Sequence, residues 1–347
     1  MRLILATSVD PFVKGGAQQI VEWLGIKLRE KGHEVEVLEF PHAAGPEMAL
    51  EQILAMRFVD VSNYGDRLIA IRPPSYALRH PHKIVWFIHH YRSAYDLWQT
   101  RYCDIADTPE GVTLREAIVS ADTVALGEAK AVYANSMVTA ARLQEHNGIH
   151  SSVLYPPLLD SGRYWCGPFS DYVLYISRLT NHKRQWLAIE AIRHTRTPVK
   201  LLVAGPPDPR APDYACSLNA LLAKYKLEDR VQVWPEWISE DKKRELFANS
   251  LAVAYFPVDE DSYGYPCLEA CHSGKPVITT TDAGGTSELI TDGVNGFVAD
   301  SRPEAVAAAF DQLFRNRLLA SQMGRQGTAA IERLRIGWDN VLAALLS

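Results

Sequence analysis

Acidic residues flank a turn in the stretch DEDSYGYPCLEACHSGKPV, residues 259–277. Asp259, Glu260 and Asp261 precede the Tyr-Gly-Tyr-Pro turn, and Glu269 follows it in a segment typical of a helix. Two carboxylates about 5 to 10 Å apart across an open cleft could act as the acid and the base of a glycosidase. A carboxylate on the loop and another on the helix could instead hold the hydroxyl groups of an extended ligand.

Basic residues gather in SRLTNHKR, residues 177–184. Arg178 and Lys183 lie in a loop between a strand and a helix, so they could converge on one diphosphate, with Arg184 as a further candidate. Cations at the start of a helix oppose its dipole, and a bound anion would relieve that repulsion. The alternative is a set of solvated loop charges, but the position at the carboxyl edge of a sheet favours binding.

Two adjacent glycines occur in KGGAQQ, residues 14–19, between the first strand and the first helix. Gly15 and Gly16 would let an anion come close to the backbone amides at the helix start. The pattern is neither GxGxxG nor a P-loop with its Lys and Ser/Thr, which weakens dinucleotide and P-loop interpretations. A plain turn remains the alternative to anion binding.

His89 and His90 end the apolar segment IVWFIHH. Neighbouring residues of a strand point to opposite faces, so we expect one histidine to face a ligand as a hydrogen-bonding group. A histidine without a role is equally compatible with the sequence. The five cysteines form no CxxC pair, which suits reduced thiols in a cytoplasmic enzyme, and Cys267 and Cys271 are expected to be buried thiols and not ligands.

Apolar strands alternate with amphipathic helices along the chain, as in parallel sheets covered by helices. The first half predicts strands at 2–7, 33–40, 67–72, 83–89, 131–136 and 152–157, and helices at 17–32, 113–128 and 137–146. The second half predicts strands at 171–177, 199–205, 230–235, 251–257 and 276–280, and helices at 185–194, 213–226, 239–250, 266–273 and beyond 302. Residues 158–170 lack periodicity and are the expected linker. We therefore predict an α/β protein of two Rossmann-like doubly wound domains that face one another across a cleft, where ligands of parallel sheets bind.

Composition is that of an ordinary soluble globular protein, and the length fits two domains. The chain has 347 residues, of which 47% are hydrophobic and 22% charged, and its net charge is −5 with no block of like charges. This argues against a nucleic-acid partner. No apolar run reaches the roughly 18 residues of a membrane span. A cytoplasmic location is expected, with attachment at the inner face of the membrane still open.

Taken together, the motifs resemble those of a retaining glycosyltransferase of family 4, in the glycosyl transferases group 1 with the GT-B architecture. The resemblance covers nearly the whole chain and follows the family's order, through GGAQ, LREKGHEVEV, FIHH, VYANSMVTAARL, VLYPP, LYISRLTNHKR, DSYGYPCLEA, SGKPVITT and GGTSELITDGVNGFV. It implies an N-terminal acceptor-side domain at 1–160 and a donor domain at 171–325. It also implies a final helix within 326–347 that returns to the first domain.

The resemblance implies a role for each candidate residue. Arg178 and Lys183 would bind the donor diphosphate, approached from the first domain by Gly15 and Gly16, and Glu269 would hold the ribose hydroxyls. Asp261 would contact the transferred sugar, together with the backbone of Ser262, Tyr263, Gly264 and Tyr265, and His89 would lie near the reaction centre.

Three departures from the family pattern stand out. Asp261 replaces a glutamate, so Asp259 or Glu260 could share its task; His90 replaces a frequent acidic residue; and VWPEWIS (233–239) replaces a glycine-bearing loop beside the base.

By this resemblance the protein would transfer a hexose from a nucleoside-diphosphate sugar to a hydroxyl of a glycan or lipid-linked acceptor, with retention and with neither metal nor cofactor. UDP-glucose-type donors are slightly favoured over GDP-mannose. A sugar-nucleotide epimerase of the same fold and a non-catalytic nucleotide-sugar-binding protein are the alternatives, and donor turnover separates them. A phosphorylase would need a phosphate or pyridoxal site and a longer chain.

Overall fold

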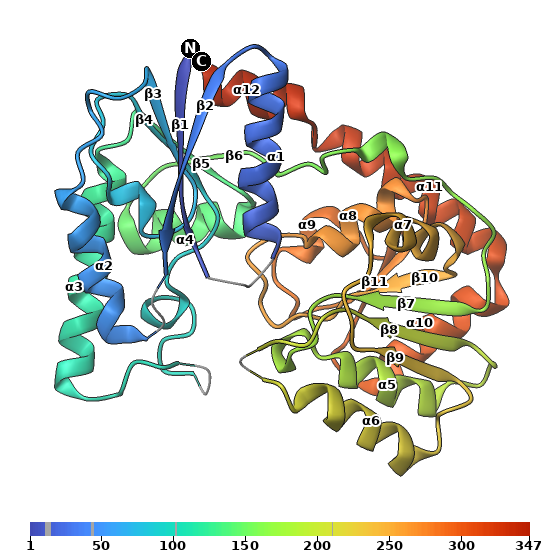
Figure 1. The fold of residues 1–347 in the computed structure, drawn as a ribbon. Helices are drawn as coiled ribbons and strands as arrows, with labels where there is room; N and C mark the ends of the chain where they lie inside the picture. The colour runs from blue at the N-terminus through green and yellow to red at the C-terminus, as the bar shows by residue number, and fades with distance from the viewer. Residues whose placement is uncertain (11–14, 43–44, 101–102, 210) are drawn as a thin grey trace. The chain divides into compact units, whose positions relative to one another are not determined.

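The computed structural model describes residues 1–10, 15–42, 45–100, 103–209 and 211–347. The chain forms two compact units, one of residues 1–156 with 337–347 and the other of residues 157–336. Each unit contains a six-stranded parallel sheet with helices packed against it (Figure 1). The predicted α/β class with two doubly wound parallel sheets is confirmed.

The first unit follows the order of a doubly wound sheet, β2-β1-β3-β4-β5-β6. Its elements are β1 (Arg2–Val9), α1 (Gly16–Glu30), β2 (Glu34–Pro41), α2 (Pro46–Phe58), β3 (Arg67–Ala70), β4 (Lys83–Phe87), α3 (Pro109–Gly127), β5 (Ala131–Ala134), α4 (Met137–Asn147), β6 (Ser152–Val153) and α12 (Trp338–Leu346). The terminal helix α12 is anchored here, because Arg67 Nη1 and Tyr133 OH donate to the carbonyls of Leu345 and Ala344, at 2.6 and 2.9 Å.

The second unit has the strand order β12-β11-β10-β7-β8-β9. Its elements are β7 (Tyr172–Ile176), α5 (Gln185–His194), β8 (Lys200–Ala204), α6 (Tyr214–Tyr225), β9 (Val231–Trp234), α7 (Glu240–Asn249), β10 (Ala252–Ala254), α8 (Tyr265–His272), β11 (Val277–Thr280), α9 (Thr286–Leu289), β12 (Gly296–Ala299), α10 (Pro303–Arg315) and α11 (Arg317–Arg333). In Figure 1, α5, α6 and α10 lie on one face of this sheet, and α7, α8, α9 and α11 lie on the other.

Both sheets reverse their winding direction once, and ligands of such folds bind at that point. The first sheet reverses between β1 and β3, and the second between β7 and β10. Because the strands are parallel, the loops after β7 and β10 leave the same edge of the second sheet as neighbours. The loops that carry Lys183 and Asp261 are these two loops.

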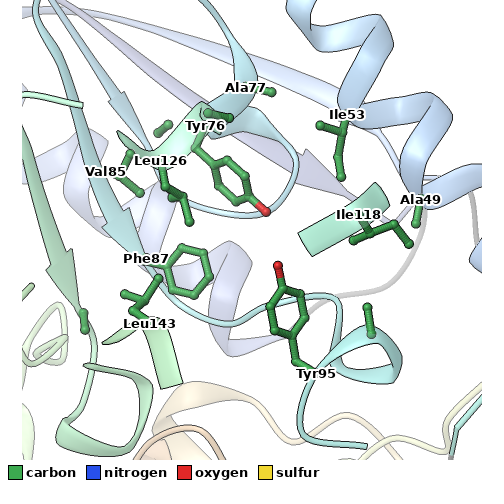
Figure 2. Packing of buried hydrophobic residues seen from close by; sticks show 14 of the residues in the cluster. Ala49, Ile53, Tyr76, Ala77, Val85, Phe87, Tyr95, Ile118, Leu126 and Leu143 are labelled. Atoms are coloured by element: carbon green, nitrogen blue, oxygen red, sulfur yellow. The ribbon is translucent and has the colours of Figure 1, made fainter. Parts of the chain in front are cut away.

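A polar cluster lies inside the apolar core of the first unit, where Figure 2 shows the Tyr76 and Tyr95 hydroxyls pointing toward one another. The hydroxyls of Tyr76 and Tyr95 each donate to a different oxygen of the Asp122 carboxylate, at 2.7 Å. Asp122 is 1% exposed, and burial raises its pKa to about 6 because the charged form loses hydration. The two tyrosine hydroxyls favour the carboxylate but do not outweigh burial.

Three features differ from the predicted elements. Helix α2 and strand β12 were not expected from the sequence. The expected boundary at residue 325 lies within α11, and the chain rejoins the first unit only at Gly337. The expected linker, residues 158–170, belongs to the second unit, where Lys275 Nζ donates to the Gly167 carbonyl at 2.9 Å. In the described part of the chain, we find no helix with the length and apolar character needed to span a membrane.

Candidate functional site

Three loops meet at one edge of the second sheet, after β7, β10 and β11. These strands are neighbours in the sheet and run parallel, so their carboxyl ends lie together. The loops are joined through their backbones, because Val258 N donates to the His182 carbonyl at 2.9 Å and Glu260 N donates to the Ala283 carbonyl at 3.2 Å. The acidic and basic stretches singled out in the sequence therefore lie at the same place.

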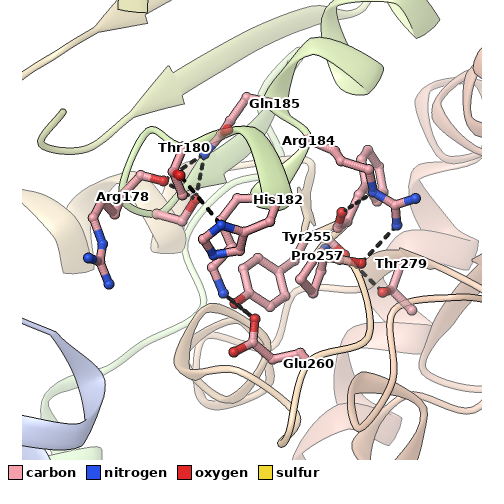
Figure 3. Close-up of polar contacts among 12 residues, drawn as sticks. Arg178, Thr180, His182, Arg184, Gln185, Tyr255, Pro257, Glu260 and Thr279 are labelled. Atoms are coloured by element: carbon pink, nitrogen blue, oxygen red, sulfur yellow. Dashed lines mark hydrogen bonds and ion pairs between the residues drawn. The ribbon is translucent and has the colours of Figure 1, made fainter. Parts of the chain in front are cut away.

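Arg184 ties these loops together (Figure 3). Its Nε donates to the Phe256 carbonyl at 2.7 Å, its Nη2 donates to the Pro257 carbonyl at 2.8 Å, and both terminal nitrogens contact the Asp282 carboxylate at 2.7 Å. Burial opposes the charge on Asp282, but hydrogen bonds from Arg184 and Ser301 hold its pKa well below the usual value. Arg184 is only 8% exposed, so its role is structural and not that of the further diphosphate ligand considered from the sequence.

Lys183 places an ammonium group beside the turn. Its Nζ donates to Tyr255 OH at 2.8 Å and forms an ion pair with Glu260. Tyr255 OH also donates to the same Glu260 carboxylate oxygen, at 3.3 Å. Tyr175 fixes the backbone behind the ammonium group, because its hydroxyl donates to the Lys183 carbonyl and accepts from Phe256 N. A cation is thus held where the sheet reverses its winding.

Arg178 lies on the same loop but contacts a different carboxylate. Its Nη1 is 3.7 Å from Asp208 Oδ2, and its side chain is 33% exposed. Gln185 steadies the loop, because its Nε2 donates to Ser177 Oγ and to the Arg178 carbonyl, both at 2.9 Å. Figure 3 shows the Arg178 guanidinium well apart from Glu260. The expected convergence of Arg178 and Lys183 on one anion stays a prediction.

The turn at residues 261–265 requires glycine where it enters α8. Gly264 has a φ of 73°, and a Cβ there would lie 2.4 Å from Tyr255 Cε1. Pro266 lies in the first turn of α8, as predicted from the sequence. Asp261, Ser262 and Tyr265 are partly exposed, whereas Tyr263 is buried, with 1% of the residue exposed.

Glu269 lies one turn into α8 and is 3% exposed. Lys243 Nζ, from α7, is 2.7 Å from its Oε1, and Tyr164 OH donates to the same oxygen at 3.0 Å. Burial raises the pKa of Glu269, and Lys243 opposes that shift. Neither Lys243 nor Tyr164 was singled out in the sequence, where a lysine in a charged helix and a tyrosine in an irregular segment carry no signal of a contact with Glu269.

The structure gives His89 and His90 different surroundings. His90 is 2% exposed, stacks on Tyr95, and lies 2.8 Å through Nε2 from Asn147 Oδ1. His89 is partly exposed, and its Nδ1 lies 2.7 Å from the His90 carbonyl. Because a carbonyl only accepts, His89 Nδ1 carries the proton and its Nε2 is left as an acceptor. Burial and Arg72 lower the pKa of His89 to about 4, so the ring is neutral at pH 7.

Gly15 and Gly16 begin α1 beside the point where the first sheet reverses. Gly15 is the residue before the helix, with an extended backbone, and the first turn of α1 contains no acidic residue. Lys14, the first residue of the predicted KGGAQQ motif, lies outside the described residues. Within the ranges that the structure describes, no group of three or more His, Cys, Asp and Glu side chains could hold a metal ion.

The two parallel sheets with their covering helices are the fold of the GT-B glycosyltransferases. The chain is similar in structure to the Anabaena protein HepE, which was solved in complex with UDP and glucose. The TM-score is 0.71 at 19% identity, over 100% of this chain and 99% of HepE. For the sucrose-phosphate synthase of Thermosynechococcus elongatus the TM-score is 0.74 at 17% identity, over 99% of this chain and 98% of that one. At these identities the likeness shows the fold.

Residues 170–330, a little under half of the chain, match the family model of the glycosyl transferases group 1. The chain is 28% identical to the human alpha-1,3/1,6-mannosyltransferase ALG2 over 59% of this chain and 55% of that protein. It is 25% identical to a D-inositol 3-phosphate glycosyltransferase of Geodermatophilus obscurus over 70% of this chain and 56% of that protein. The matched region thus spans just over half the length of these two relatives.

Proposed function

We propose that the protein is a retaining glycosyltransferase of family 4 that moves a hexose from a nucleoside-diphosphate sugar to an acceptor hydroxyl. The observation that carries the proposal is the Lys183 ammonium, which is held by Tyr255 and Glu260 where the second sheet reverses its winding. A cation fixed at that position is suited to a diphosphate. The family-model match over residues 170–330 and the buried Glu269 carboxylate on the adjoining helix support it.

Each part of the donor has a proposed partner in the second unit. Arg178 and Lys183 bind the diphosphate. When the phosphate binds, the Lys183–Glu260 ion pair either breaks or stays in place while Lys183 also contacts the phosphate. Asp261 and the backbone of residues 262–265 bind the transferred sugar. Glu269 accepts hydrogen bonds from the ribose hydroxyls, as a buried carboxylate beside a ligand can.

The first unit supplies the remaining proposed contacts. Gly15 and Gly16 present backbone amides at the start of α1 to the diphosphate. His89 accepts a hydrogen bond from the transferred sugar through Nε2, the nitrogen that its contact with the His90 carbonyl leaves unprotonated. Since its pKa is about 4, the ring stays neutral and does not repel a developing positive charge on the sugar.

The reaction needs no covalent link to the protein. The bond from the anomeric carbon to the diphosphate loosens, and the sugar takes on oxocarbenium character. The acceptor oxygen bonds to the same face of the anomeric carbon, and its proton goes to the departing phosphate oxygen. Arg178 and Lys183 stabilise the charge that accumulates on the leaving diphosphate, which is the role that a metal would otherwise fill.

UDP-glucose-type sugars and GDP-mannose are the donors to test first. The names of the similar proteins point both ways, since HepE was solved with UDP and glucose whereas ALG2 is a mannosyltransferase. We propose a glycan or a lipid-linked glycan as the acceptor, in polysaccharide or glycoconjugate synthesis, and a lipid-linked acceptor would bring the protein to a membrane surface.

A donor panel tests the proposal. Purified protein is heated with UDP-, GDP- and ADP-sugars, and release of nucleoside diphosphate is measured in parallel. A bound donor raises the melting temperature by mass action, and we expect both stabilisation and slow release with one base. Isomerised donor without release would show an epimerase, binding without turnover would show a sensor, and no response to any donor would contradict the proposal.

A further inference from the structure

Two side chains hold the carboxylate of Glu269 through the same oxygen. Lys243 Nζ and Tyr164 OH contact Oε1, at 2.7 and 3.0 Å. Because both of these contacts are made at Oε1, we assign Oε2 as the oxygen that meets a ligand hydroxyl. Side chains from α7 and from the segment before β7 thereby fix the rotation of a carboxylate on α8.

Lys243 is itself partly buried and is bound on two sides. Its side chain is 14% exposed, and its Nζ also lies 2.8 Å from Glu240 Oε1, one turn earlier on α7. Burial opposes the positive charge, but Glu269 and Glu240 outweigh it and raise the pKa of Lys243. The two carboxylates thus hold the ammonium group from two sides, which restricts its position.

Tyr164 is positioned just as closely. The Arg244 guanidinium lies 5.7 Å from its ring centroid, and the Phe247 ring meets it edge-on at 6.4 Å. Both residues belong to α7, the helix that carries Lys243. Helix α7 therefore supplies one donor to Glu269 directly and holds the residue that supplies the other.

We propose that Lys243 is a positioning residue for nucleoside recognition, which fixes Glu269 so that Oε2 accepts from the ribose hydroxyls of the donor. The inference rests on the proposed function, in which Glu269 binds the ribose, and it adds two residues to that site, with Tyr164 as the second donor to the same oxygen. It predicts that the preference for ribose over a sugar without hydroxyls depends on a lysine that does not touch the nucleotide.

The preference should depend on Lys243 because the protonation state of Glu269 depends on the Lys243 ammonium group. A carboxylate this deeply buried takes up a proton when no positive charge faces it. The carboxylic acid then has one donor and a weaker acceptor, and it can rotate, so it no longer presents a fixed charged acceptor to two hydroxyls. If Lys243 only stabilised the packing of α7 against α8, its loss would leave the preference for ribonucleotides unchanged.

The test compares ribonucleotides with their 2′,3′-dideoxy counterparts. Dissociation constants of UDP, GDP and ADP, and of the dideoxy form of whichever binds, are measured by calorimetry for the intact protein and for Lys243→Met. The intact protein should prefer the ribonucleotide by about 10- to 100-fold, the range for hydrogen bonds to a charged acceptor. Lys243→Met should reduce this preference to about threefold or less.

Lys242→Met is the matched control, because Lys242 lies next in the chain on α7, pairs with Glu245 and is 46% exposed. It should keep the full preference. Inorganic pyrophosphate has no ribose, so its affinity should be the same in all three proteins. Tyr164→Phe removes only a hydroxyl and should give an intermediate preference, which keeps the test available if Lys243→Met does not fold.

The outcomes distinguish failure of the positioning role of Lys243 from failure of the proposed function. A full ribose preference in Lys243→Met, or in Tyr164→Phe if only that variant folds, overturns the positioning role. An intact protein that binds a nucleoside diphosphate without preferring the ribonucleotide overturns the assignment of Glu269 and the inference with it. An intact protein that binds none of the three nucleotides overturns the proposed function itself.

Discussion

Replacing Lys183 with methionine removes the cation on which the proposed function depends. The side chain is 13% exposed, and Met keeps most of its apolar stem, so the change deletes chiefly the charge. A hydrogen bond to a charged group is worth about 1.5 to 3 kcal/mol. Affinity for the donor diphosphate should therefore fall by about 10- to 150-fold, at 1.4 kcal/mol for each factor of ten.

The same substitution takes the cation away from Glu260, which is 24% exposed and stays beside Tyr255. We expect unfolding to become easier by about 1 to 3 kcal/mol, the cost of losing a partner from a partly buried charged group. Adding Glu260→Gln should recover most of that stability without restoring donor binding. The double variant thus separates a folding defect from a binding defect.

The assay measures nucleoside diphosphate binding by calorimetry and donor turnover by release of the nucleoside diphosphate, with urea unfolding on the same samples. Lys200→Met is the control, since Lys200 begins β8 at the opposite edge of the same sheet and pairs with Asp171. Near-normal turnover in a folded Lys183→Met protein would refute the assignment of Lys183 to the diphosphate.

Three further predictions concern other residues of the site and the core. Asp261→Glu should broaden donor use, measured as the ratio of kcat/KM for UDP-glucose and GDP-mannose, and an unchanged ratio would point to Asp259 or Glu260 instead. Gly264→Ala should cost about 2 to 5 kcal/mol in urea unfolding, from its positive φ and the contact with Tyr255, and a change under 1 kcal/mol would contradict the required turn. Asp122 has a pKa of about 6 against a usual 3.8, so the folded state binds the proton more tightly and loses about 3 kcal/mol as pH rises from about 4 to about 6. Comparing intact protein with Asp122→Asn over that range should show this difference, and parallel stability curves would exclude it.

The sequence predicted those parts of the fold whose signal is local. The buried parallel strands read as short apolar runs, and their order along the chain located both doubly wound sheets. Helix α2 was missed because its apolar residues do not form one stripe, as the exposure of Met48, Leu54 and Phe58 shows. Helix α11 spans the expected boundary at residue 325 and packs closely against the second unit there, since a Cβ at Gly324 would lie 1.9 Å from the Gly274 carbonyl oxygen.

For the site too, the sequence predicted the local features and not the contacts between residues far apart in the chain. The loops after β7 and β10 could be located from their place in the chain, and the structure brings Lys183 and the acidic turn together as that placement suggested. The partners within the site could not be located, since Glu260 is 77 residues from Lys183 and Tyr164 is 105 residues from Glu269 along the chain. In the sequence, Arg184 looked equivalent to Lys183. In the structure its backbone is left-handed, and its guanidinium binds the loop after β10 through the Phe256 carbonyl.

The stereochemistry of the first sugar released tests the central claim most directly. Purified protein is supplied with the donor that stabilises it, with water as the acceptor, and the anomer is followed by NMR before mutarotation. A retaining transferase acting on an α-linked donor should release the α-hexose together with nucleoside diphosphate. Release of the β-hexose would contradict the retaining mechanism, and no release from any UDP-, GDP- or ADP-sugar would contradict the assignment of glycosyl transfer.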